Sequence, residues 1–152
     1  MKTLTNGQDR EELLRRLSVI SLDSPRSWGR MTVTEMVCHL TDAFRVSMGE
    51  RQTRPIGSWA TRTLLKPAAL WVPRKWPQSF PTVAECDASR KGTPAAEWDA
   101  DMVALLAAFE RFTRRPREYA LQAHPIFGPM TEREWMRWGY LHTDHHLRQF
   151  GV

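Results

Sequence analysis

Cysteine is scarce in this chain and long apolar runs are absent, and each shortage excludes a class of protein. Only Cys38 and Cys86 are present and they form no CxxC pair, so neither a disulfide framework nor a thiolate metal site is expected. The longest apolar run covers residues 102–109, far short of the ~20 residues that cross a bilayer, and the first ten residues lack the apolar region of a signal peptide. We therefore expect a cytoplasmic protein with reduced thiols and no membrane segment.

Several catalytic and architectural signatures are also missing. The sequence has no internal repeat, no phosphate-binding glycine loop, no GxSxG motif and no HExxH motif with its glutamate base. No segment alternates apolar and polar residues for long enough to predict a strand. Because 152 residues is the size of one ordinary globular domain, we predict a single all-α domain over residues 1–152.

Basic charge is concentrated in one part of the chain. The net charge is +5, and the segment 51–91 alone holds eight lysines and arginines against two acidic residues. Trp59, Trp71 and Trp76 lie among these basic residues. The tryptophan rings could stack on the bases of a nucleic acid while the basic side chains neutralise its phosphates. No recognised nucleic-acid motif accompanies this pattern, so nucleic-acid binding is the less favoured interpretation. An anionic, partly apolar small molecule and a plain solvated surface are the alternatives.

Four segments have the periodicity of amphipathic helices. Capping boxes are predicted where Thr32 precedes Glu35 and where Thr131 precedes Glu134. Thr93, followed by a proline, predicts the start of the third helix. The four predicted helices cover residues 8–20, 32–49, 93–116 and 131–151.

The connections between these helices predict their order. The first two helices and the last two are joined by short links, whereas residues 50–92 separate the second from the third. Short links join antiparallel neighbours, and a long link can join two parallel helices. We predict a four-helix bundle in up-down-down-up order. Its long connection, with one short helix near residues 58–65, is expected to pack over an end of the bundle.

Three of the five histidines lie in one stretch, LHTDHHLRQF. His142 and His146 are one helical turn apart and share a face with tryptophans. His39 lies near the edge of the apolar stripe of the second helix, and antiparallel packing would bring it to the same height. A metal ion would remove the cost of burying unpartnered imidazoles. The pattern predicts a three-nitrogen site with an open coordination position, with ordinary partly buried or surface histidines as the alternative.

Four further residues are candidates for supporting roles. His145 lies at the border of the inward face, so we expect it in an outer shell or at the surface. His124 is predicted to have a structural role in the HPIFG turn. Glu35 and Asp42 flank the histidine of the second helix and could orient its imidazole. The alternative for each of these two is a solvated helical charge.

The segments WGRMTVTEMVCHL (28–40) and HPIFGPMTEREWMRWGYLHTDHHLRQFG (124–151) resemble the DinB-like superfamily of bacterial four-helix proteins. Within it, the chain is most similar to a branch of uncharacterised proteins ending in HHLRQFG. The resemblance covers most of the chain and is weaker in the middle. It implies an up-down-down-up bundle, commonly dimeric, with one metal ligand from the second helix and an HxxxH pair from the fourth. Carried over, the implied ligands are His39, His142 and His146.

The resemblance also implies a range of activities. The superfamily includes thiol S-transferases and isomerases that use low-molecular-weight thiols, and proteins described as metal-dependent hydrolases. Three neutral imidazoles suit a divalent transition metal, for which we favour zinc or nickel, and such an ion can hold a thiolate or activate water. We predict a metal-dependent enzyme with thiol S-transferase-like chemistry on a small molecule, with a hydrolase or a non-catalytic metal-binding module as alternatives. No catalytic residue beyond the metal ligands is identified.

Overall fold

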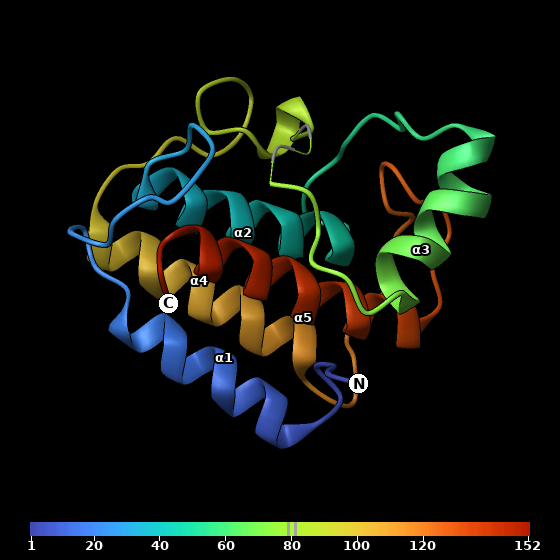
Figure 1. Ribbon diagram of the computed structural model, residues 1–152, viewed down its shortest axis with the longest axis horizontal. Coiled ribbons are helices and arrows are strands. Elements are labelled where there is room, and N and C mark those ends of the chain that lie inside the picture. The colour runs from blue at the N-terminus through green and yellow to red at the C-terminus, as the bar shows by residue number, and fades with distance from the viewer. Residues whose placement is uncertain (79, 81) are drawn as a thin grey trace.

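The computed structural model describes residues 1–78, 80 and 82–152, and within them the protein is all-α (Figure 1). Helix α2 packs against α4, and α1 packs against α5. The prediction of an all-helical protein without strands is confirmed for the described residues. No helix among them is long and apolar enough to cross a membrane. The five helices are α1 (Gly7–Val19), α2 (Val33–Met48), α3 (Lys66–Trp71), α4 (Trp98–Thr113) and α5 (Glu132–Gln149).

The two predicted capping boxes fix where α2 and α5 begin. The Thr32 hydroxyl accepts from the Glu35 amide while the Glu35 carboxylate accepts from the Thr32 amide, and Thr131 and Glu134 do the same at α5. Helix α2 ends at Gly49, whose φ of 82° is the left-handed conformation that glycine adopts most readily. These ends set the register of the two helices that carry the histidine cluster.

The predicted start of the third helix is wrong. Helix α4 begins at Trp98, where the Glu97 carboxylate accepts from the Ala100 amide. Thr93 lies four residues before this cap and is engaged elsewhere, because its amide and hydroxyl donate to the Asp42 carboxylate, each at 2.7 Å, and its hydroxyl oxygen accepts from Arg51. The threonine that reads as a cap in the sequence instead joins the long connection to α2.

The long connection is more helical than predicted. The π-helical turn η1 (Thr61–Leu65) continues directly into α3, so the short helix expected near residues 58–65 extends to Trp71. Helix α3 packs against α5, and the short 3₁₀ helix η2 (Ala84–Cys86) packs against α2. Helix α3 therefore covers the end of the bundle where α5 begins, as expected, whereas η2 lies against α2 beside His39. Ser79 and Pro81 lie outside the described residues.

Ion pairs near the helix ends show which helices run together. Arg111, in the last turn of α4, pairs with Glu50, just beyond the end of α2, at 2.8 Å. Arg16, in the last turn of α1, pairs with Asp144 in the second half of α5 at 2.7 Å. Helices α2 and α4 therefore share one direction, and α1 and α5 share one direction.

Helices α2 and α5 run in opposite directions. The side chain of Gln149, the last residue of α5, donates to the carbonyl of Trp28, which lies shortly before α2 begins. The start of α2 and the end of α5 are therefore adjacent. This places His39, early in α2, level with His142 and His146, late in α5.

The other half of the bundle is filled by aromatic side chains. The ring centroids of Phe44 and Phe112 are 5.0 Å apart, and those of Phe112 and Trp135 are 6.3 Å apart. All three side chains are fully buried and come from α2, α4 and α5 respectively. Close-packed rings resist displacement, so this layer holds the three helices at fixed spacing beside the histidines.

Candidate metal centre

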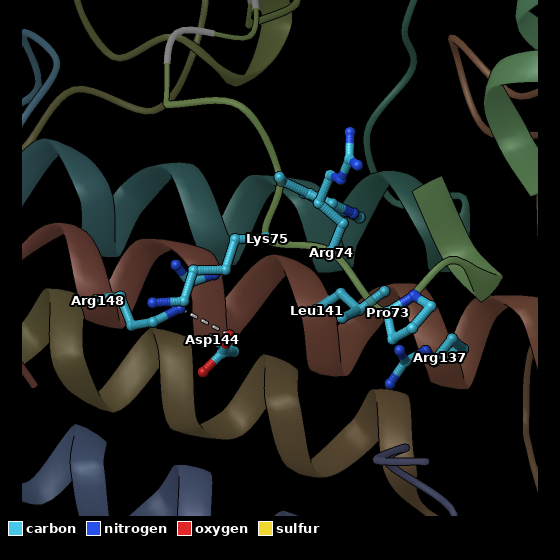
Figure 2. Close-up of a pocket in the computed structure, with 8 residues that line it drawn as sticks. Pro73, Arg74, Lys75, Arg137, Leu141, Asp144 and Arg148 are labelled. Atoms are coloured by element: carbon cyan, nitrogen blue, oxygen red, sulfur yellow. Dashed lines mark hydrogen bonds and ion pairs between the residues drawn. The ribbon is translucent and has the colours of Figure 1, made fainter. Parts of the chain in front are cut away.

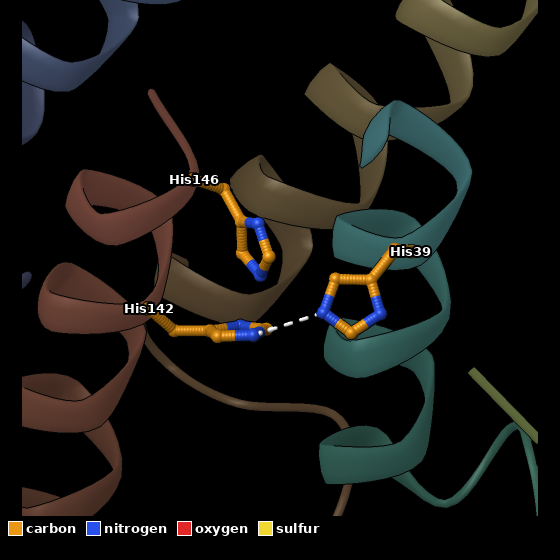
Figure 3. A group of neighbouring side chains, drawn as sticks. All are labelled: His39, His142 and His146. Atoms are coloured by element: carbon orange, nitrogen blue, oxygen red, sulfur yellow. Dashed lines mark hydrogen bonds between the residues drawn. The ribbon is translucent and has the colours of Figure 1, made fainter. Parts of the chain in front are cut away.

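Three histidines converge in the space between α2 and α5 (Figure 3). The Nε2 atoms of His39 and His142 are 3.0 Å apart. The ring of His146 lies 4.7 Å from that of His39 and 4.8 Å from that of His142, measured between centroids. One nitrogen from each ring lies within 4.8 Å of the others, an arrangement that could hold a metal ion. The structure thus brings together the three residues that the sequence selected.

The tautomer of His39 follows from its partner. Its Nδ1 lies 2.8 Å from the main-chain carbonyl oxygen of Cys86. A carbonyl can only accept, so Nδ1 carries the proton and Nε2 carries a lone pair. The bond to Cys86 therefore aims the lone pair of His39 at the other two histidines.

His146 is held in the same way from within α5. Its Nδ1 lies 2.8 Å from Oε1 of Gln149. The amide nitrogen of Gln149 donates to the Trp28 carbonyl, so its oxygen must be the atom that faces the imidazole. His146 therefore also donates through Nδ1 and keeps a lone pair on Nε2.

His142 completes the cluster and has an unmet hydrogen bond. Its Nδ1 is buried with no hydrogen-bond partner among the described residues, and Trp138 stacks on the ring at a centroid distance of 4.6 Å. Zn–N bonds of ~2.0–2.1 Å in a tetrahedral site place imidazole nitrogens about 3.3 Å apart. The observed 3.0 Å between the Nε2 atoms of His39 and His142 is close to that spacing, and all three nitrogens lie within 4.8 Å of one another, so the cluster could hold a transition metal.

The three rings are electrically neutral near pH 7. Burial lowers the pKa of His39, and burial followed by repulsion from neighbouring imidazoles lowers the pKa of His142 and His146 further. Neutral imidazole is the form that binds metals. The cluster contains no carboxylate, so an ion bound by these three nitrogens would keep its full positive charge.

Asp42 supports the cluster indirectly. Its fully buried carboxylate lies 3.1 Å from the Arg51 guanidinium. Arg51 in turn donates to the carbonyls of Glu85 and Lys91, on either side of Cys86. The Asp42–Arg51 pair therefore fixes the loop whose carbonyl holds His39.

Neither Glu35 nor Asp42 orients the imidazole of His39, and the alternative of a solvated charge is wrong for Asp42 alone. Neither carboxylate makes a hydrogen bond to His39 in the described structure, because Glu35 is used by the capping box of α2 and Asp42 by Arg51 and Thr93. Asp42 is not solvated either, since its side chain is 1% exposed.

His145 lies beside the cluster and outside it. Its ring centroid is 5.2 Å from that of His146 and 6.1 Å from that of Trp76. The residue is buried, its Nδ1 has no described hydrogen-bond partner, and burial lowers its pKa to about 4. The structure thus places it next to a candidate ligand, as expected for an outer-shell residue, and not at the surface.

His124 has the structural position that the sequence predicts. Its Nδ1 accepts from the amides of Ile126 and Phe127, each at 3.1 Å, and its ring stacks on Phe127 at 4.6 Å. Burial lowers its pKa to about 3. The imidazole therefore closes the HPIFG turn as a neutral acceptor.

Three supporting groups were not among the residues predicted from the sequence. Gln149 lies three residues after His146, so helical spacing could have indicated it. Arg51 and the Cys86 carbonyl come from the long connection and have no spacing relation to His39. A main-chain carbonyl also has no residue-type signature, so only the folded chain could reveal this contact.

The chain matches a known protein family. A family described as "Protein of unknown function (DUF1569)" matches residues 3–151, nearly the whole chain. Comparison with curated proteins and comparison with solved structures give no match.

The buried state of His124 predicts a pH effect on stability. The pKa of this imidazole is about 3 in the folded protein and near 6.5 when unfolded. Between these values the unfolded chain binds the extra proton, so the free energy of unfolding falls as the pH is lowered below 6.5. In His124→Asn, the amide oxygen can still accept from the turn but cannot titrate. Between pH 6 and 4 we expect the free energy of unfolding of this variant to change less steeply with pH than that of the wild type, by up to about 1.4 kcal/mol per pH unit.

Urea unfolding at a series of pH values measures these slopes. Identical slopes for the wild type and His124→Asn would contradict the assignment.

Proposed function

We propose that this chain, which belongs to the DUF1569 family of unknown function, binds one divalent transition metal through His39, His142 and His146. The observation that carries the proposal is the pair of fixed Nδ1 contacts. They leave the Nε2 lone pairs of His39 and His146 aimed at one space beside His142. Imidazole donors of this kind favour zinc or nickel over magnesium or calcium.

We further propose a DinB-like fold for this chain. Its support is that α1 and α5 run in one direction while α2 and α4 run in the other, the up-down-down-up order that the sequence resemblance implies. One candidate ligand comes from the second long helix and an HxxxH pair comes from the last, again as the resemblance implies. The homodimer expected from the resemblance stays a prediction.

For the chemistry, we favour transfer of a low-molecular-weight thiol to a small molecule. A bound metal supplies positive charge that stabilises a thiolate or lowers the pKa of water. The described cluster offers no carboxylate as a general base, and a thiolate nucleophile depends less on one than water does.

The thiol would have to come from outside the protein. Burial raises the pKa of both Cys38 and Cys86 to about 12, so both side chains stay protonated and unreactive near neutral pH. Neither cysteine belongs to the three-histidine cluster. A thiol cosubstrate is therefore part of the proposal, with water-dependent hydrolysis as the alternative.

The ligand assignment is tested by removing each histidine. We expect His39→Ala, His142→Ala and His146→Ala each to weaken zinc binding by more than about 100-fold. In each variant only two of the three imidazoles remain to bind the ion. His124→Asn and His145→Ala should keep the affinity within about tenfold, because neither side chain makes a hydrogen bond to a candidate ligand in the described structure.

Competition with a chromophoric chelator measures the affinity, and circular dichroism checks that each variant is folded. Tight stoichiometric zinc in folded His39→Ala would overturn the cross-helix site.

The choice between thiol and water is tested with the cobalt-substituted protein. Cysteine, glutathione and bacillithiol are titrated in turn while the visible absorption is recorded. A sulfur-to-cobalt charge-transfer band at sub-millimolar thiol is expected, because the thiolate enters the metal's first shell. No band with any thiol, together with thiol-independent hydrolysis of esters or amides, would favour the hydrolase alternative instead.

A further inference from the structure

A basic recess lies against α5 (Figure 2). Its volume is about 220 Å³ and it is open to solvent. Ligand pockets commonly measure ~300–1,000 Å³, so this recess has room for one chemical group of a ligand and not for a whole large molecule. Helix α5 contributes Arg137, Leu141, Asp144 and Arg148, and the chain after α3 contributes Pro73, Arg74, Lys75 and Trp76.

The recess carries an excess of positive charge. Four of its side chains are cationic and only Asp144 is anionic. Both oxygens of Asp144 are already engaged, one by Arg16 at 2.7 Å and the other by Arg148 at 2.9 Å. Arg74 and Lys75 are exposed, and neither takes part in an ion pair within the described residues. The attraction for an anion is therefore left largely uncancelled.

Arg137 is the buried cation of the recess. The residue is 7% exposed, and within the described residues its guanidinium donates to two neutral acceptors, the carbonyls of Leu70 at 2.9 Å and Lys2 at 2.5 Å. No carboxylate pairs with it in the described part of the chain. A buried charge without a counter-ion costs free energy, and guanidinium groups bind carboxylates and phosphates through paired hydrogen bonds. An oxoanion in the recess would supply the missing partner.

Trp76 connects the recess with the histidines. Its indole lines the recess, and the ring centroid lies 6.3 Å from that of His142 and 6.1 Å from that of His145. The indole N–H donates to the Ala69 carbonyl at 2.8 Å, which fixes the ring. One aromatic side chain therefore borders both places.

We propose that the recess binds the oxoanion group, a carboxylate or a phosphate, of the small molecule on which the histidine cluster acts. Arg137, Arg74 and Lys75 hold this group, and the rest of the molecule passes Trp76 toward the metal. The link to the metal rests on the proposed function. The anion site itself does not, because none of its cations belongs to the cluster.

Anion binding is tested by calorimetric titration of inorganic phosphate and of succinate at constant ionic strength. We expect saturable binding of at least one of them. In Arg74→Ala/Lys75→Ala it should weaken by about tenfold, the equivalent of one charge-assisted hydrogen bond. The matched control Arg15→Ala/Arg30→Ala removes two exposed cations outside the recess and should change the affinity by less than about twofold.

Equal weakening in the two double variants would show only diffuse attraction to a basic protein and would overturn the site. The absence of saturable binding of both anions would overturn it as well. Because Arg137 also bonds the main chain, Arg137→Lys is compared only after thermal unfolding shows a folded protein. The Arg137→Lys variant should bind the anions at least about threefold more weakly than the wild type, since lysine keeps the charge but lacks the planar guanidinium that donates paired hydrogen bonds.

The link to the metal is tested separately. Cobalt-loaded protein is titrated with ω-mercaptocarboxylic acids of increasing length, each compared with the neutral mercaptoalcohol of equal length. We expect one length at which the carboxylate improves binding by about tenfold, and we expect Arg74→Ala/Lys75→Ala to abolish that advantage. If no length shows an advantage, the link is wrong even when phosphate still binds.

Metal-free His39→Ala separates the two proposals. It should bind the anions as the wild type does, because His39 lies on α2 and outside the recess. If His39→Ala binds the anions like the wild type, while no thiol binds cobalt in the cobalt-loaded wild type, the anion site is supported and the thiol chemistry is wrong. Loss of anion binding in this variant would contradict an independent recess.

Discussion

The hydrogen bond from His39 Nδ1 to the Cys86 carbonyl is the contact on which the candidate site depends. It settles which nitrogen of His39 carries the proton and turns the other toward α5. The carbonyl is in place because the Asp42–Arg51 pair holds the surrounding loop through two further main-chain carbonyls. A buried ion pair is costly to form unless its groups are also hydrogen-bonded, and here Thr93 and the loop carbonyls supply those bonds.

Gln149 has the corresponding role on α5. Its amide accepts from His146 and donates to Trp28, so one side chain both fixes a tautomer and joins the end of α5 to the start of α2. The orientation of the imidazoles and the antiparallel packing of their helices thus depend on the same group. Contacts of this kind commonly change metal affinity by ~10–100-fold, so the candidate metal site and the packing of the bundle depend on the same side chain.

The sequence predicted the parts of this arrangement that are local along a helix. The capping boxes at Thr32 and Thr131 and the one-turn spacing of His142 and His146 follow from short-range geometry, and they agree with the structure. Thr93 and Asp42 were misjudged because their partners are each other, 51 residues apart in the chain. The basic segment that holds Arg74 and Lys75 suggested an anionic small molecule, but the sequence could not place Arg137 beside them, since the recess forms only where the chain after α3 lies against α5.

X-ray absorption at the zinc edge of the zinc-loaded protein would identify the ligands of the ion itself. For the three-histidine site we expect three imidazole nitrogens at ~2.0–2.1 Å with one further light atom. We expect one imidazole to be lost from this shell in His39→Ala. A spectrum with fewer than three imidazoles in the wild type, or with sulfur or carboxylate ligands from the protein, would contradict the three-histidine site.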